Sequence, residues 1–289
     1  MIRCFDLALP HGITLACRAA GATTEAPRVL LLHGFPEAAF VWDEVMDLLS
    51  ARASCWGPNL RGYAGSSSPA GVAAYRARHL LADVVATIEA FGAPLDLLVG
   101  HDWGGALAWN LAAARPDLLR RLLIINAPHP AAFLRELRDN PAQQAASGYM
   151  NQLCRPDAEA RLAADGFAGL WGFFGQPAWL TPALREAYRR TWALGLTGPV
   201  NYYRASPLRP PEAASDTIHS LQLPDAMVTV GVPTTVLWGE ADTALLPGLL
   251  DGLERWVPDL RVERLPGASH WLVHERPQLV ADTIAGLLG

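Results

Sequence analysis

The stretch 97-LLVGHDWGGALAW-109 reads as a buried strand that turns directly into a helix. Its first residues are apolar, as in a strand covered on both faces, and Gly100 and Gly104 permit a tight turn at the point of change. A strand–turn–helix with the spacing G-x-S-x-G lifts its central side chain above the carboxyl end of a parallel sheet. Here that residue is Asp102, where the pattern has a serine. The stretch therefore predicts a parallel sheet with a carboxylate displayed at its edge.

An aspartate in this place has a chemistry of its own. Its reference pKa is about 3.9, so Asp102 is expected to be ionised at neutral pH, and the N-terminus of the following helix favours negative charge. A carboxylate can attack a saturated carbon that bears a leaving group, and an ester is then left on the protein. Hydrolysis of that ester needs a base that activates water and N–H donors for the oxyanion. We therefore expect a two-step covalent reaction at Asp102.

Two loops further along the chain offer the base and its partner. They are 237-LWGEADTALLP-247 and 265-LPGASHWLVHERP-277, and each includes or follows one of the last two expected strands. The order Asp102, Asp242, His270 is that of a nucleophile, an acid and a histidine on this kind of sheet. We expect His270 to activate water and Asp242 to orient and charge-stabilise the imidazole.

The oxyanion donors are expected from two backbone N–H groups. One belongs to Trp103, directly after the carboxylate, and the other to Phe35, in 33-HGFPE-37 after an earlier strand. His33 and His101 flank these residues, and we expect both to hold loops together. The remaining histidines show no partner pattern and are interpreted as structural: His11, His79, His129, His219 and His274.

Strand-like and helix-like segments alternate in two parts of the chain, which predicts a mostly parallel sheet with helices on both faces. Between these parts the alternation stops, and helical segments, prolines and aromatic residues predominate. We therefore expect a core formed by residues 1–128 and 231–289, with an inserted helical lid over 129–230. Within the second part of the core, residues 246–256 are expected to form one helix.

Composition narrows the class of protein. The net charge of −5 is spread without basic runs, which argues against nucleic acid or an anionic membrane as a partner. No uncharged apolar stretch reaches about 18 residues, and the first residues lack a signal-peptide pattern. The four cysteines lack C-x-x-C spacing, so we expect buried thiols in a reducing cytoplasm. Metal-ligand patterns and a phosphate-binding loop are also absent from the sequence, and no metal or cofactor is predicted.

The chain resembles the α/β-hydrolase superfamily over nearly its whole length, and within it the epoxide hydrolases. The resemblance is carried by 33-HGFPE-37, 59-NLRGYAG-65, 100-GHDWGG-105, 239-GEAD-242 and 267-GASHW-271. It implies an α/β-hydrolase fold, with a mostly parallel sheet, helices on both faces and an inserted helical lid. It also implies a small apolar epoxide and water as reactants, a vicinal diol as product, and no cofactor.

In epoxide hydrolases, tyrosine hydroxyls of the lid hydrogen-bond the epoxide oxygen and help it leave as an alcohol. The segment 198-GPVNYYRASPL-208 resembles the motif that carries one of them, which makes Tyr203 the donor by resemblance. The segment 147-SGYMNQLCRPDAEARL-162 resembles the part that carries the other. Its candidate is Tyr149, although a different alignment places Asn151 at that position.

Two other functions stay open at this point. A haloalkane or haloacid dehalogenase would use the same ester chemistry, with the Trp103 indole as a halide donor. Haloalkane dehalogenases usually carry Asn or Glu where Phe35 stands, and fluoroacetate dehalogenases carry Arg where Trp103 stands, so both differences favour the epoxide. A non-catalytic small-molecule binding protein would not need Asp102, Asp242 and His270 together. The sequence leaves the substrate, its enantiomer and the oligomeric state open, with a homodimer among the alternatives.

Overall fold

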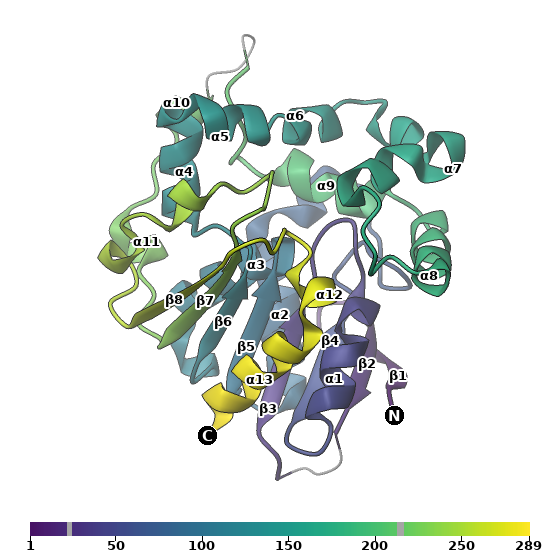
Figure 1. The fold of residues 1–289 in the computed structure, drawn as a ribbon, viewed down its shortest axis with the longest axis vertical. Helices are drawn as coiled ribbons and strands as arrows, with labels where there is room; N and C mark the ends of the chain where they lie inside the picture. Colours follow the sequence, from purple (N-terminus) through teal and green to yellow (C-terminus); the bar gives the residue numbers. More distant parts are fainter. Residues whose placement is uncertain (22–24, 213–216) are drawn as a thin grey trace.

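The computed structural model describes residues 1–21, 25–212 and 217–289, and an eight-stranded sheet forms its centre (Figure 1). The strands lie in the order β1-β2-β4-β3-β5-β6-β7-β8. Their bounds are β1 Arg3–Ala8, β2 Thr14–Ala20, β3 Arg28–Leu32, β4 Ser54–Pro58, β5 Leu97–His101, β6 Leu122–Ile125, β7 Thr234–Gly239 and β8 Leu260–Leu265. Strand β2 pairs antiparallel with β1 and β4, and the other neighbouring strands pair in parallel. The predicted mostly parallel sheet is confirmed.

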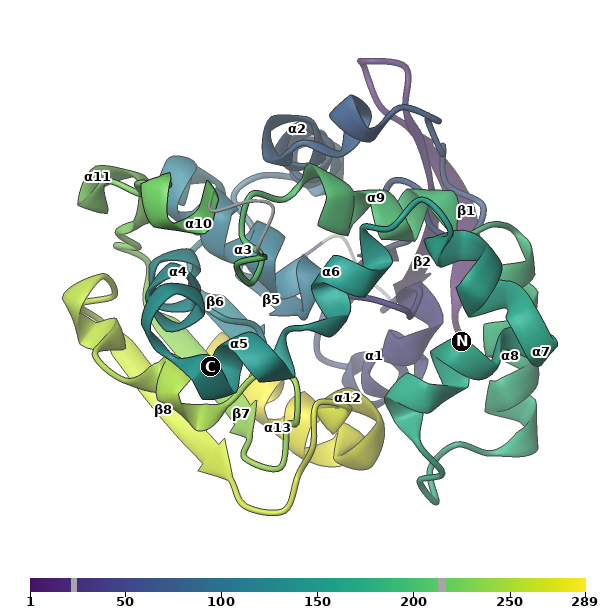
Figure 2. The same ribbon diagram turned by 90° about the horizontal axis from the view of Figure 1, so that it is seen from above.

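Helices cover both faces of this sheet. Seen from above, α1 and α13 lie on one side of the central strands, and α2 and α3 lie on the other (Figure 2). The core helices are α1 Asp43–Leu49, α2 Ala77–Phe91, α3 Trp103–Ala114, α12 Leu272–Glu275 and α13 Pro277–Leu288, with short 3₁₀ turns η1 Ala39–Trp42, η2 Val72–Tyr75 and η3 Pro116–Leu118. Because both faces are covered, the central strands are continuous apolar runs, and every residue of β5, β6 and β7 is buried.

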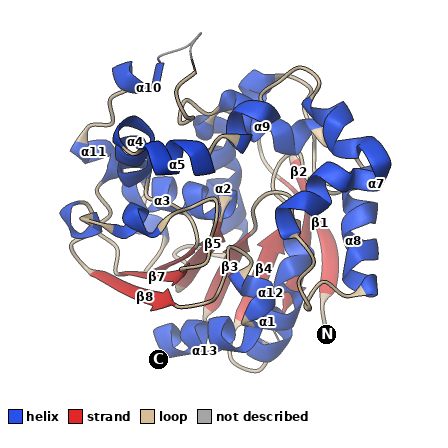
Figure 3. Cartoon of the chain, turned by 45° about the horizontal axis from the view of Figure 1, so that its top comes forward, coloured by secondary structure: helices blue, strands red, loops and turns tan. Residues whose placement is uncertain are grey.

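A layer of helices lies beyond the carboxyl ends of the parallel strands (Figure 3). All of them come between β6 and β7 in the chain, within the residues predicted to form the lid, of which 213–216 lie outside the described residues. The bounds of the helices between β6 and β7 are α4 Pro130–Asp139, α5 Pro141–Ala146, α6 Tyr149–Leu153, α7 Ala158–Phe174, α8 Pro182–Ala193, α9 Thr197–Ala205, α10 Thr217–Ser220 and α11 Asp225–Val228. Of these, α11 lies at the side of the sheet and packs against α3. Side chains from α6, α7 and α9 can therefore face the end of the sheet at which β5 turns into α3.

The prediction of one helix over residues 246–256 is wrong. The structure has two short 3₁₀ turns there, η4 Pro247–Leu250 and η5 Leu253–Arg255. Between them Asp251 is extended and Gly252 adopts a left-handed conformation with φ 70°. Apolar spacing alone suggested a helix, but an extended residue followed by a left-handed one cannot continue helical hydrogen bonding.

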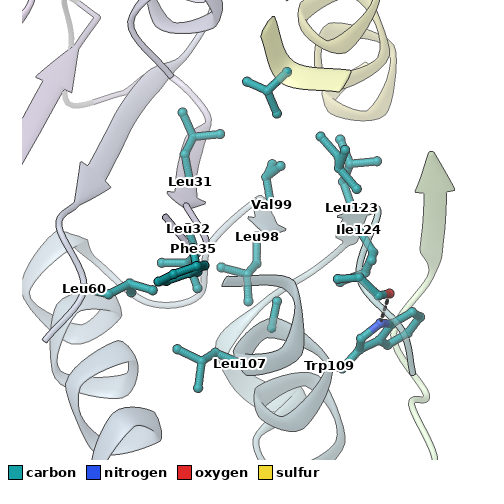
Figure 4. Close-up of a cluster of buried hydrophobic side chains, with 14 of the residues drawn as sticks. Leu31, Leu32, Phe35, Leu60, Leu98, Val99, Leu107, Trp109, Leu123 and Ile124 are labelled. Atoms are coloured by element: carbon teal, nitrogen blue, oxygen red, sulfur yellow. Dashed lines mark hydrogen bonds between the residues drawn. The ribbon is translucent and has the colours of Figure 1, made fainter. Parts of the chain in front are cut away.

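The hydrophobic core holds the strand ends and α3 together, as Figure 4 shows. Side chains of β3, β5 and β6 alternate between the two faces of the sheet in this cluster: Leu32, Leu98 and Ile124 lie on the side of α3 and its Leu107, whereas Leu31, Val99 and Leu123 lie on the opposite side. The indole N–H of Trp109 on α3 donates to the carbonyl of Ala127, 3.1 Å away, just after β6. This packing fixes the start of α3 relative to three neighbouring strands.

Candidate active site

Asp102 lies at the turn between β5 and α3. Its φ of 50° and ψ of −120° are rare for a residue with a side chain, and such strain costs about 1–3 kcal/mol. The turn is closely packed, because a Cβ on Gly104 would overlap the carbonyl oxygen of Leu32, and one on Gly100 would lie 2.6 Å from the carbonyl oxygen of Gly104. The glycines are therefore required for the turn that raises Asp102 above the sheet.

One carboxylate oxygen of Asp102 is held by the backbone. The N–H of Phe35 donates to Oδ1 over 2.6 Å, and the N–H of Trp103 also hydrogen-bonds the carboxylate. Burial raises the pKa of Asp102 above its ordinary value, against the lowering effect of His270, His101 and the two N–H groups. The N–H of Phe35, one of the two expected oxyanion donors, thus holds Oδ1, while Oδ2 lies 3.7 Å from Nε2 of His270.

His270 lies between two carboxylates. Its Nδ1 is 2.6 Å from Oδ2 of Asp242, and its Nε2 is 3.7 Å from Oδ2 of Asp102. Burial alone would lower the pKa of His270, but the charges of Asp242 and Asp102 raise it to about 9. In the resting site the imidazole is therefore protonated at neutral pH.

Asp242 is held in place on all sides. Burial alone would raise its pKa, but the charge and hydrogen bond of His270 and the N–H groups of Leu245 and Ala244 bring it below its ordinary value. Those two N–H groups donate to Oδ1 over 2.9 and 2.8 Å. The carboxylate thus stays ionised and can support a charged imidazole.

Asn126 completes this arrangement and was not predicted from the sequence. It is fully buried directly after β6, and its Nδ2 donates to Oδ2 of Asp242 over 2.9 Å. Its Oδ1 accepts the N–H of Gly239 over 2.9 Å, and its φ is 39°. An asparagine at the end of a strand could have indicated a residue with a left-handed φ, which asparagine tolerates. Nothing in the sequence links Asn126 to Asp242, however.

Both tyrosines predicted to belong to the lid line the cavity that contains Asp102. Tyr203 of α9 and Tyr149 of α6 line it, with ring centroids 6.0 Å apart. Burial raises the pKa of both phenols, so each keeps its proton at neutral pH. Asn151, the other candidate from the sequence, instead donates to the carbonyl of Pro210 over 3.1 Å.

The cavity has a volume of about 420 Å³ and is mostly apolar. The two tyrosines, Asp102, Asp242 and His270 share it with a set of aromatic side chains: Phe35, Phe173, Phe174 and Trp271. A pocket of this size and character, with a few convergent polar groups, suits a small organic ligand. Within the described residues, no cluster of three or more His, Cys, Asp and Glu could hold a metal ion.

A buried carboxylate links the lid to the loop of His270. Glu37 accepts the hydroxyl of Tyr188, on α8, over 2.8 Å, and its other oxygen lies 3.2 Å from Nδ1 of His101. Nε2 of His101 lies 2.9 Å from the carbonyl oxygen of His270. His274 also reaches Glu37, at 3.0 Å. The expectation that His101 holds a loop agrees with these contacts, but the sequence did not indicate Glu37 or Tyr188.

Comparison with known proteins places this geometry in a family. Residues 27–277 match the family model described as alpha/beta hydrolase fold. The chain is 34% identical to the AB hydrolase superfamily protein YfhM of Bacillus subtilis over 95% of this chain and 94% of that protein. It is 34% identical to epoxide hydrolase 3 of Xenopus tropicalis over 91% of this chain and 71% of that protein.

Solved structures give the same result. The crystal structure of Bacillus megaterium epoxide hydrolase in complex with an inhibitor is similar with a TM-score of 0.90 and 30% identity, covering 98% of this chain and 99% of that one. Among the described helices, none has the length and apolar character needed to cross a membrane. The shared fold, the match over most of the chain and the aspartate at the turn after β5 lead to one conclusion: the chain belongs to the α/β-hydrolase family, in its epoxide hydrolase-like branch.

Proposed function

We propose that this protein is a hydrolase that opens an apolar epoxide to a vicinal diol through an alkyl ester on Asp102. The relatives named epoxide hydrolases support the reaction class. One observation about the site carries the mechanism. A carboxylate with one oxygen held by a backbone N–H group shares a cavity with two protonated tyrosines, Tyr203 and Tyr149. These are the groups needed to attack a ring carbon and to receive the oxygen that leaves it.

In the first step, Oδ2 of Asp102 attacks a carbon of the epoxide and the ring C–O bond breaks. The electrons of that bond pass to the ring oxygen, which takes a hydrogen bond and then a proton from the lid, with Tyr203 as the principal donor and Tyr149 beside it. Oδ1 becomes the carbonyl oxygen of the new ester, still bonded to the N–H of Phe35. The ester therefore forms with its carbonyl already in the oxyanion site.

In the second step, water attacks the ester carbon and His270 takes its proton. His270 becomes a base at this stage because esterification removes the negative charge of Asp102, one of the two carboxylates that raise the imidazole pKa. Asp242 stabilises the imidazolium that forms. The tetrahedral intermediate then expels the alkoxide, which takes the remaining proton of the attacking water to give the diol and the Asp102 carboxylate. The proton that the resting imidazolium gives up after esterification restores the phenol of Tyr203, and the proton taken from water leaves His270 charged again, as at the start.

The dehalogenase alternative explains less of the site. A halide leaves as a stable anion and needs no proton, so it gives no role to the two tyrosine hydroxyls. Among the described residues that line the cavity, none is an arginine or lysine that could hold a haloacid carboxylate. A non-catalytic binding protein would leave the contacts among Asp102, His270 and Asp242 without a purpose, and membership of a hydrolase family argues against it.

Other attributes of the protein stay predictions from the sequence. These are a cytoplasmic location, reaction without a cofactor, and an oligomeric state with a homodimer among the alternatives. Water and a small apolar organic molecule are the reactants proposed here.

The test of the ester separates the two steps. His270→Gln should react with styrene oxide, and its intact mass should increase by the mass of one epoxide, because the ester forms but is not hydrolysed. Asp102→Ala, treated in the same way, should gain no mass. Full turnover by His270→Gln, or an adduct on Asp102→Ala, would contradict the mechanism, and turnover of haloalkanes but not epoxides by the wild type would favour the dehalogenase.

A further inference from the structure

Four aromatic rings pack edge to face in a closed circuit on one wall of the cavity. The ring centroids are 5.2 Å apart for Phe35 and Tyr203, and 6.0 Å apart for Tyr203 and Tyr149. The circuit closes through Phe173, whose centroid lies 5.6 Å from that of Tyr149 and 5.7 Å from that of Phe35. Interplanar angles between 76° and 90° are those that aromatic pairs favour. We refer to these four residues as the four-ring wall.

Phe173 is the member of the four-ring wall to which the mechanism gives no chemical step. Phe35 supplies an oxyanion N–H, and Tyr203 and Tyr149 supply hydroxyls. The Phe173 ring has no hydrogen-bonding group, so it can act on a substrate only through its shape and its apolar surface. Because it contacts both Phe35 and Tyr149, it borders the space where the proposed function places the oxirane.

The mouth of the cavity has a different character. The lining residues that are exposed to solvent are all small: Gly172, Gly175, Ala241 and Thr243. A Cβ on Gly172 would meet no atom within 4 Å, so open space surrounds this position. The cavity is therefore bounded by rings in its buried part and by small residues where it opens.

A second aromatic surface also lines the cavity. Phe174 and Trp271 are buried, line the cavity, and pack with ring centroids 4.3 Å apart. The ring of Trp271 in turn lies 4.9 Å from that of His270. A flat apolar group that extends from the reacting carbon toward solvent would contact these rings.

From these walls we propose that Phe173 selects substrates by shape. The site takes epoxides whose bulky aromatic group is joined to the oxirane by a slim, unbranched linker, and it disfavours epoxides branched at the carbon next to the ring. The linker passes Phe173, and the aromatic group lies in the wider mouth beside Gly172. This inference rests on the proposed function, because it places the oxirane between Asp102 and the lid tyrosines.

Two adjacent substitutions test the two regions in opposite directions. Phe173→Leu removes a ring from the buried part and should admit branched epoxides. Gly172→Leu fills open space at the mouth and should exclude bulky distal groups. A leucine also has a better helix propensity than glycine by about 0.8 kcal/mol, so Gly172→Leu is compatible with α7.

Each variant has a matched control. Gly286 is the third-last residue of α13, as Gly172 is of α7, and a Cβ there also meets no atom within 4 Å. Gly286→Leu therefore introduces the same side chain in the same helical context away from the cavity. Phe91→Leu controls for loss of an aromatic contact, because Phe91 stacks on Trp56 with centroids 4.3 Å apart.

The substrates are three epoxides: 1,2-epoxybutane as the small reference, tert-butyloxirane as the branched one, and naphthyl glycidyl ether as the one with a distal ring. We compare kcat/KM relative to the reference. Phe173→Leu should raise the relative value for tert-butyloxirane by about ten-fold, and Gly172→Leu should lower the relative value for the naphthyl ether by about ten-fold or more, the range for small changes of fit in an apolar pocket. Both controls should keep the wild-type ratios.

The outcomes distinguish this inference from the proposed function. If the wild type hydrolyses none of the three epoxides and forms no ester, the proposed function fails. If the wild type hydrolyses 1,2-epoxybutane but both variants keep its ratios, or change them as the controls do, the function stands and the role of Phe173 is wrong. Melting temperatures of all five proteins show whether a change in ratio accompanies a loss of folding.

Discussion

Nε2 of His270 lies 3.7 Å from Oδ2 of Asp102, a distance too long for a direct hydrogen bond between them. The other nitrogen of the same ring is bonded to Asp242 at 2.6 Å. The imidazole thus has one carboxylate that keeps its charge throughout the proposed reaction and one that loses it when the ester forms. This asymmetry makes the protonation state of His270 depend on the state of Asp102.

The first prediction concerns the pKa of His270. Asp102→Asn keeps the shape of the side chain and removes its charge, as esterification would. The pKa of His270 should then fall below the value of about 9 that the two carboxylates produce together. An NMR titration of the His270 ring proton measures this. Intact mass must be checked before and after, because an activated water could hydrolyse the amide back to aspartate, and an unchanged pKa would remove Asp102 from the electrostatics of His270.

The second prediction is a pH dependence confined to one half-reaction. Ester hydrolysis requires neutral His270, so its rate should rise with pH and reach a plateau below about pH 9, because the ester form lacks the charge of Asp102. Ester formation uses no base and should show no such rise. Single-turnover stopped-flow measurements of tryptophan fluorescence separate the two rates. A rise of the same size in both would show that His270 is not the base.

The third prediction tests the lid donor. Tyr203→Phe removes one hydrogen bond to an oxygen that becomes charged, and such bonds are worth about 1.5–3 kcal/mol. The rate of ester formation should fall by roughly ten- to hundred-fold, while hydrolysis of a preformed ester changes little. Because Tyr149 contacts Tyr203, the double change to phenylalanine should reduce ester formation further. An unchanged rate of ester formation in the double variant would contradict the role of the tyrosines and favour the dehalogenase function.

The fourth prediction concerns Asn126. Asn126→Ala removes the donor to Asp242 and places alanine at a φ of 39°, so it should lower the free energy of unfolding and slow ester hydrolysis. Asn126→Gly removes the same donor but tolerates that φ. Chemical denaturation of both variants separates backbone strain from the lost hydrogen bond. If the glycine variant hydrolyses the ester as fast as the wild type, the amide has no part in positioning Asp242.

The sequence predicts features that depend on neighbouring residues. The spacing of glycines around Asp102 specifies the turn after β5 because each glycine avoids a clash within a few residues or with an adjacent strand. The hydrogen bond between Asn126 and Asp242 joins residues 116 positions apart, so no local pattern contains it. The prediction of one helix over residues 246–256 failed for a related reason. Apolar spacing does not reveal the backbone conformations of Asp251 and Gly252, which separate the two turns found there.

The ambiguity between Tyr149 and Asn151 has a geometric origin. Two positions along a helix correspond to a rotation of about 200°, so these residues lie on nearly opposite sides of α6. A shift of the alignment by two residues therefore exchanges the side that faces the cavity for the side that faces away. The structure places Tyr149 in the cavity wall and directs Asn151 to Pro210.

The hydrogen bond from the Phe35 N–H to Oδ1 means that the two oxygens of Asp102 stay in the protein for different lengths of time. In the proposed reaction, the oxygen at Oδ2 leaves with every diol, and the oxygen of the water that attacks the ester carbon replaces it. The oxygen at Oδ1 stays in the protein for as long as the N–H groups keep the carboxylate from rotating. Each molecule of enzyme thus rebuilds half of its nucleophile from solvent in every cycle. After many turnovers in ¹⁸O-water, the Asp102 peptide should carry one heavy oxygen and retain one that was present when the chain was synthesised.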